Sequence, residues 1–198
     1  MTSDLATADP VTDFTLDALE WHPHVTPVDL AEATPAQREA LQVTPSNTKV
    51  SAYVLTLALD AEILKERTPL FNDIMYARGG LSRAERELGA LSASIVNHCV
   101  YCAQVHASRF NQLSKRPEVV EAIYRDGPAA RLPERDQAIL DFGIKLSRHP
   151  EEIGAADRER LRGVGLSDLE IMDLVHSVAI FGWANRLMHT LGQPYRPK

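Results

Sequence analysis

The sequence predicts an all-α protein, and two observations carry that prediction. Signals for helix starts recur along the chain, whereas the alternating apolar pattern of strands is almost absent. Apolar side chains also repeat at helical intervals: Leu88, Leu91 and Ile95 lie at positions i, i+3 and i+7, on one face of a helix. We therefore expect a fold of several packed helices.

Helix starts are marked by hydroxyl caps and by prolines. In a capping box, a Ser or Thr and a Glu or Gln three residues later each satisfy a backbone N–H of the first turn. Proline also suits the first turn, because an N–H at that place has no helical partner. In chain order, these signals occur at Thr34–Gln37, Thr68–Pro69, Ser82–Glu85, Pro117, Pro133 and Ser167–Glu170.

The chain is expected to have two parts, an irregular N-terminal arm (residues 1–30) and a single helical domain (residues 31–198). The arm contains three prolines and no helical period. Its Trp21 could cover the protein's own core, which is the commoner use of such a residue, or could wrap a neighbouring subunit.

A weak internal repeat predicts that the domain has two related helical halves. Shifting the chain by 85 residues aligns residues 80–95 with residues 165–180, with six identities in sixteen positions. The same shift places Ala184 on Cys99 and Leu187 on Cys102. We expect that only the first half carries thiol chemistry.

Composition and charge exclude several classes of function. The 198 residues include 21 basic and 27 acidic side chains, a net charge of −6, without the basic cluster that nucleic-acid binding requires. The most apolar stretch, Val50–Leu59, is about half of the ~20 residues that span a bilayer, and the N-terminus lacks the basic start of a secretory signal. We expect a cytoplasmic protein that binds neither nucleic acid nor membrane.

The segment from residue 87 to residue 106 holds the candidate site. On a helix, Cys99 and Cys102 lie at i and i+3, and Cys102 and His106 at i and i+4, so the three side chains share a face. The sulfurs would then be close enough to bridge after modest adjustment. A thiol of ordinary pKa is only ~3% ionised at pH 7, so a histidine or a helix N-terminus beside it would increase the reactive thiolate.

Glu87 belongs to this site only if the chain folds back. It precedes Cys99 by twelve residues, a gap of about 18 Å in an unbroken helix, from which its carboxylate could not reach His106. Asn97 is a poor residue for a helix interior and a good cap. We therefore predict a break near Val96–His98, with Cys99 in the first turn of a new helix. Without the break, Glu87 is an ordinary surface residue.

Other interpretations of these residues remain open at this point. Cys99, Cys102 and His106 would supply three of the four ligands of a structural zinc ion, although a second Cys-x-x-Cys is absent from the sequence. The two cysteines could also be inert core thiols. Several further residues could line a site or could simply form helical core, which is the commoner use of such residues: Phe71, Met75, Tyr76, Phe110, His176, Trp183 and His189.

Glu87, followed after eleven residues by Cys99-x-x-Cys102-x-x-x-His106, resembles the core motif of the alkylhydroperoxidase D and carboxymuconolactone decarboxylase-like superfamily. The chain is most similar to the branch of uncharacterised peroxidase-related proteins. The resemblance spans roughly residues 45 to 192 and is specific in the motif and loose elsewhere. Two further segments share it, Leu132–Asp136 and Asn185–Leu187.

The resemblance implies an all-helical homo-oligomer, a trimer or a hexamer, that reduces hydroperoxides through a Cys99/Cys102 pair. It implies a proton relay of Glu87 and His106, in which Cys102 is the thiol deprotonated by His106 and Cys99 is its disulfide partner. It implies neither a bound cofactor nor a metal. Electrons would come from an external dithiol, such as a lipoylated or thioredoxin-like protein. Which sulfur attacks peroxide first stays open, because the helix start favours Cys99 and the histidine spacing favours Cys102.

One position departs from the family pattern. Residue 101 is Tyr101, where well-studied alkylhydroperoxidase D proteins carry a second histidine. Tyrosine is a far weaker base at neutral pH, so Tyr101 would donate a hydrogen bond to peroxide or simply pack. Two alternatives to the peroxidase remain: a lactone decarboxylase-like enzyme that needs no thiols, and a non-catalytic helical module that senses thiol oxidation or holds zinc.

Overall fold

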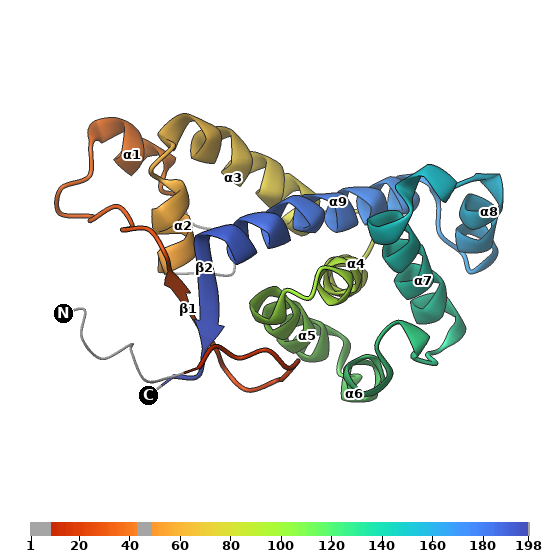
Figure 1. Ribbon diagram of the computed structural model, residues 1–198. Helices are drawn as coiled ribbons and strands as arrows, with labels where there is room; N and C mark the ends of the chain where they lie inside the picture. Colours follow the sequence, from red (N-terminus) through yellow and green to blue (C-terminus); the bar gives the residue numbers. More distant parts are fainter. Residues whose placement is uncertain (1–8, 43–48, 198) are drawn as a thin grey trace.

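The structure, a computed structural model, describes residues 9–42 and 49–197, and residues 1–8 of the expected arm lie outside this part of the chain. Helices are its main secondary structure, as the sequence predicts (Figure 1). The α-helices are α1 (Pro35–Ala40), α2 (Ala52–Leu57), α3 (Ala61–Tyr76), α4 (Arg83–Val96), α5 (Val100–Ser114), α6 (Pro117–Asp126), α7 (Glu134–Arg148), α8 (Ala155–Gly163) and α9 (Asp168–Leu191). Two 3-10 turns, η1 (Gly127–Ala129) and η2 (Pro150–Glu152), flank α7, and two short strands are β1 (Glu20–Pro23) and β2 (Gly192–Tyr195).

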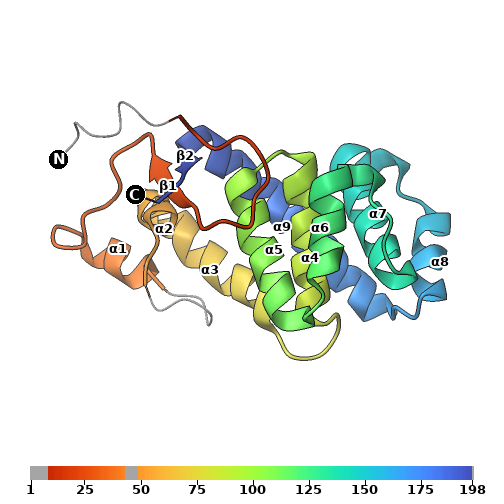
Figure 2. The same cartoon turned by 90° about the horizontal axis from the view of Figure 1, so that it is seen from below.

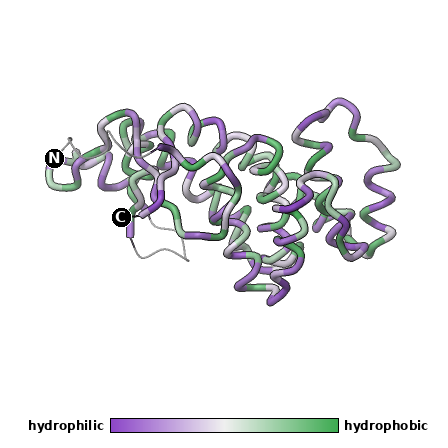
Figure 3. Tube along the Cα trace, turned by 60° about the horizontal axis from the view of Figure 1, so that its bottom comes forward, coloured by the Kyte–Doolittle hydropathy of each residue, from purple (hydrophilic) through white to green (hydrophobic). Residues whose placement is uncertain are grey.

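Helix α4 is the centre of the fold. It packs against α5, α7 and α9, and every residue from Arg86 to Ile95 is buried. Figure 2 shows α4 between neighbouring helices, with α9 passing behind it. Along the trace, hydrophobic and hydrophilic residues alternate within the helices and do not gather in one segment (Figure 3), as expected for helices that each turn one face to a core.

Small residues let the neighbouring helices approach α4 closely. A Cβ at Gly89 of α4 would lie 2.6 Å from the Ser177 hydroxyl of α9, and a Cβ at Gly143 of α7 would lie 2.9 Å from the Cβ of Ser92 on α4. Neither position has room for a larger side chain. The central helix is therefore held by backbone-to-backbone approach on two sides.

Most of the expected helix starts are confirmed. Capping boxes are present at Thr34, Ser82 and Ser167, and Pro117 is the first residue of α6. Pro133 is the residue directly before α7.

The start expected at Thr68–Pro69 is wrong. Helix α3 begins eight residues earlier, because the Asp60 carboxylate accepts a hydrogen bond from the Ile63 N–H at 3.2 Å and caps it. Pro69 lies inside this helix, where it removes one backbone hydrogen bond without ending the helix. The stronger acidic cap prevails over the Thr-Pro signal.

The two segments aligned by the internal repeat share local structure. Gly80 and Gly165 both have positive φ angles, +64° and +87°. Each is followed by a buried leucine and then by the serine that caps the next helix. Within the helices that follow, Ser92 and Ser177 each donate a hydrogen bond to the carbonyl three residues back. The relation between the two complete halves stays a prediction.

The arm contains a strand that the sequence did not predict. Strand β1 pairs with β2 in antiparallel register, with Trp21 opposite Pro194. The Trp21 indole is buried and donates to the Met188 carbonyl at 3.2 Å. Gly192 makes room for the indole, because a Cβ there would lie 2.3 Å from the ring. Of the two uses expected for Trp21, the structure shows the first: it covers its own chain.

In the described part of the chain, none of the helices combines the length and the apolar character needed to cross a bilayer.

We expect Gly143→Ala to lower the free energy of unfolding by about 2 kcal/mol, since the added methyl group overlaps the fixed Cβ of Ser92. Gly163→Ala is the matched control, because its Cβ meets no atom within 4 Å, and it should leave stability unchanged or raise it by up to ~1 kcal/mol. Urea unfolding of both variants measures the difference. Equal stability of the two variants would contradict the close approach of α7 to α4.

Candidate active site

The chain folds back between α4 and α5, where the sequence predicts a break. Helix α4 ends at Val96, and His98 takes a left-handed conformation with φ of +54°, which reverses the chain direction. The details of the cap differ from the expectation. Asn97 is the C-cap of α4, and Cys99 itself is the N-cap of α5.

The reversal brings Glu87 of α4 to His106 of α5. The His106 Nδ1 lies 2.5 Å from the Glu87 Oε2, and both side chains are buried. Arg83, one turn earlier on α4, donates from Nε to the other carboxylate oxygen at 2.9 Å, and its Nη2 donates there as well. Glu87 is therefore a buried member of the site, as predicted, and not a surface residue.

The partners of Glu87 fix its charge. Burial alone raises the pKa of Glu87, but the hydrogen bond and charge of His106, together with Arg83, outweigh burial and hold the pKa below its ordinary value of 4.5. His106 also contacts an apolar group, because its imidazole packs against the ring of Phe181 in a T-shaped arrangement with centroids 4.0 Å apart. Glu87 therefore stays ionised and fixes the orientation of the imidazole.

Cys99 and Cys102 are free, buried thiols that interact with each other. The interaction of each thiol with the other is the largest influence on the pKa of both groups. It lowers the pKa of Cys99, to which the Cys102 backbone N–H and the Asn185 side chain also contribute, and it raises the pKa of Cys102, as does burial. Of the two thiols, Cys99 is therefore the more acidic.

Asn185 of α9 is a site residue whose role sequence reasoning missed. Its amide is fully buried, accepts from the Asn97 Nδ2 at 3.1 Å and donates to the Ser94 hydroxyl at 3.3 Å. These contacts orient the amide toward the thiols, whose pKa values it lowers. The one indication of Asn185 in the sequence was that it belongs to a segment similar to the family. Its spacing from Cys99 did not indicate a role at the thiols.

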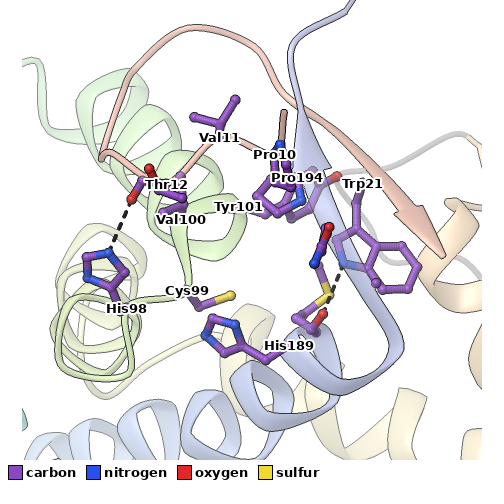
Figure 4. A pocket seen from close by; sticks show the side chains of 13 residues that line it. Pro10, Val11, Thr12, Trp21, His98, Cys99, Val100, Tyr101, His189 and Pro194 are labelled. Carbon is purple, nitrogen blue, oxygen red and sulfur yellow. Dashed lines mark hydrogen bonds between the residues drawn. The ribbon is translucent and has the colours of Figure 1, made fainter. Parts of the chain in front are cut away.

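Two cavities flank the thiol pair. Cys99 lines a cavity of about 260 Å³ beneath the arm, where it lies between His98 and His189, with Thr12 across from it (Figure 4). The His98 ring is held by the Thr12 carbonyl at 3.2 Å. Cys102 lines a second cavity, of about 360 Å³, together with Glu87 and His106.

Tyr101 lines both cavities, between the two thiols in sequence. Burial is the main cause that raises the pKa of its hydroxyl, and the neighbouring Cys102 and Cys99 raise it further. The phenol stays protonated at neutral pH and can donate a hydrogen bond. It cannot serve as a base.

The structure sorts the other residues singled out in the sequence. Phe71, Met75 and Tyr76 line the cavity of Cys102, and His189 lines that of Cys99. Phe110 is core, with no exposed surface. His176 and Trp183 lie on exposed parts of α9.

The geometry does not favour zinc at the thiols. Within residues 9–42 and 49–197, the ligand atoms of Cys99, Cys102 and His106 do not gather within 4.8 Å of one another. The group that does is His149, Glu151 and Glu152, an exposed acidic cluster remote in sequence from the thiols. His106 is instead bonded to Glu87.

Comparison with known proteins identifies the family. The model of the carboxymuconolactone decarboxylase family matches residues 61–140. A peroxidase-related protein of uncharacterised function from Silicibacter sp. TM1040 is 31% identical, with a TM-score of 0.71 over 86% of this chain and 92% of that chain. This chain belongs to the alkylhydroperoxidase D and carboxymuconolactone decarboxylase-like superfamily.

Two further solved structures are similar to this chain. A protein from Ralstonia eutropha JMP134, described as an alkylhydroperoxidase AhpD core and as peroxidase-related, is 29% identical, with a TM-score of 0.76 over 89% of this chain and 92% of that chain. The debrominase Bmp8 shares the fold at 19% identity, with a TM-score of 0.67 over 84% of this chain and 89% of that chain. Among functionally curated proteins, none matches the sequence of this chain.

We expect Glu87→Gln to lower the free energy of unfolding by about 2 kcal/mol at pH 7, because it removes the charge that Arg83 and His106 compensate. Since the folded pKa of Glu87 is depressed, its contribution is present above pH 4.5 and is lost as the pH falls through the folded pKa. The difference in the free energy of unfolding between the variant and wild type should therefore become smaller in acid. Unfolding curves at several pH values measure it, with exposed Glu121→Gln as control. A difference in unfolding free energy that does not change with pH would contradict an ionised Glu87 that stabilises the fold.

We expect Asn185→Ala to raise the pKa of Cys99, because the thiolate loses an amide donor. Alkylation of the thiols by iodoacetamide at pH 7 should slow about fivefold, and its pH profile should move toward alkaline pH. Thr190→Ala, on the exposed side of the same helix, is the control and should leave the profile unchanged. An unchanged profile in Asn185→Ala would remove Asn185 from the site.

Proposed function

We propose that this protein is a thiol-dependent peroxidase that reduces organic hydroperoxides through Cys99 and Cys102. The observation that carries the proposal is the placement of two buried, free thiols, of which Cys102 opens on the same cavity as the buried Glu87–His106 pair. The peroxidase-related relatives support the same chemistry. An inert pair of core thiols would need neither the base nor the cavity.

In the first step, Cys102 gives up its thiol proton to Cys99 or toward His106, which the Glu87 carboxylate holds in place. The resulting Cys102 thiolate attacks the terminal oxygen of the hydroperoxide. The S–O bond forms as the O–O bond breaks, and the alkoxide leaves as an alcohol after taking up a proton. The product at Cys102 is a sulfenic acid.

In the second step, the Cys99 sulfur attacks the sulfenic acid. The S–S bond forms, the S–O bond breaks, and water leaves with the thiol proton. Because the two thiols belong to one buried cluster, this step competes well with over-oxidation of Cys102. An external dithiol then returns two electrons and two protons to the pair and becomes a disulfide itself.

We propose two further properties on the strength of the family. The dithiol is supplied by a partner protein, of the lipoylated or thioredoxin-like kind. The chain acts as a homo-oligomer, a trimer or a hexamer.

We expect one equivalent of cumene hydroperoxide to remove two thiols per chain within seconds and to yield a Cys99–Cys102 disulfide by mass spectrometry. Cys99→Ser should stop at a sulfenic acid on Cys102, trapped by dimedone, whereas Cys102→Ser should consume no peroxide. Peptide mapping identifies the labelled residue. Survival of both wild-type thiols would overturn the proposal, and a label on Cys99 in the Cys102→Ser variant would reverse the order of attack.

A further inference from the structure

The cavity of Cys102 is basic, although the protein is acidic. Four basic side chains line it, Lys49, Arg67, Arg83 and Arg109, against a single carboxylate, that of Glu87. The net charge of the whole chain is −6. A surplus of positive charge at this one cavity indicates a preference for anionic ligands.

Arg67 of α3 is a partly buried cation of this cavity that has no acidic partner in the described part of the chain. Arg83 is paired with Glu87, and Arg109 donates to the Gln112 side chain at 2.6 Å. Among the residues that the structure describes, none places a carboxylate within ion-pair distance of Arg67, and its buried Nε has no hydrogen-bond partner. Asp60, which lines a neighbouring groove with Arg67, is used to cap α3.

The surroundings of Arg67 hold its guanidinium in place without neutralising it. It stacks over the ring of Phe71, with its central carbon 4.3 Å from the centroid. Burial is the main cause that lowers the pKa of Arg67, and the phenols of Tyr53 and Tyr76 oppose this effect. A partly desolvated guanidinium without an anion is costly, and a ligand carboxylate would relieve that cost through paired N–H···O bonds.

Tyr53 connects Arg67 to the thiols. It lines the same cavity as Arg67 and Cys102. Its hydroxyl is buried and, in the described part of the structure, has no hydrogen-bond partner. Burial raises its pKa, so it stays protonated and can donate to an oxygen of a bound molecule.

We propose that the preferred substrates are hydroperoxides that carry a carboxylate, with Arg67 binding the carboxylate while the peroxide reaches Cys102. The apolar side chains of Phe71, Met75 and Phe181 would contact the carbon chain between the two groups. A cavity of about 360 Å³ is at the small end of ligand sites, which span about 300–1,000 Å³, and suits a short or medium-length acid. The carboxylate takes no part in the bond changes. The inference therefore depends on the proposed peroxidase for the reaction, but not for the binding of the anion.

The test compares a medium-chain alkanoic acid that carries a terminal hydroperoxide with its methyl ester, which differs only in charge. The rate of thiol loss is followed in single turnovers without reductant, so that any preference belongs to the peroxide and not to the dithiol. Wild type should react about 10- to 100-fold faster with the acid at low concentration. Equal rates for acid and ester would overturn the proposal.

Variants assign the preference to Arg67. Arg67→Gln should abolish the preference by slowing the acid and leaving the ester within about twofold, whereas Arg67→Lys should retain part of it because the charge remains. Arg78→Gln is the matched control, an exposed arginine just after α3 that removes the same charge, and it should keep the preference. If Arg67→Gln slows the acid and the ester equally, the role of Arg67 is structural and the assignment is overturned. If Arg67→Gln does not fold, the ratio of the acid and ester rates in Arg67→Lys decides the question.

Binding separates this inference from the peroxidase itself. Octanoate should bind the reduced wild type at least tenfold more tightly than octanol by calorimetry, and Arg67→Gln should lose the difference. If the protein reduces neither peroxide but this difference is present, the peroxidase proposal fails and the anion site stands. If octanoate binds no better than octanol, the anion site fails whatever the peroxidase result.

Discussion

The burial of one carboxylate, that of Glu87, constrains the rest of the site. It lies on α4, which other helices surround, and an ionised carboxylate in such a place costs several kcal/mol unless cations or donors compensate it. Arg83 comes from the same helix, but His106 can reach Glu87 only if the chain turns back on itself. The left-handed residue His98 provides that reversal, and it places the N-terminus of α5 beside the core.

The reversal also determines the state of the two thiols. Cys99 becomes the N-cap of α5, and Cys102 lies one turn later, so that the two thiols shift each other's pKa in opposite directions. The site is then completed from both ends of the chain, because Asn185 comes from α9 and Trp21 from the arm that pairs with the last strand. Residues remote in sequence therefore control the ionisation and the access of the pair.

The two sides of the thiol pair differ in a way that suits a two-stage reaction. Cys102 faces the larger cavity, with Glu87, His106 and the excess of positive charge around Arg67. Cys99 faces a smaller cavity roofed by the arm. A substrate and a reductant would thus have separate approaches to one disulfide, with Tyr101 and Met188 lining both cavities.

The sequence by itself determined the local features: the helical class, the capping boxes at Ser82 and Ser167, and the break that brings Glu87 into the site. These depend on hydrogen bonds within a turn or two, which nearby residues decide. The tertiary structure decided that Asn185 orients toward the thiols and that Arg67 lacks an acidic partner. Such features depend on which distant side chains packing brings together and which it keeps apart, and no spacing along the chain encodes that.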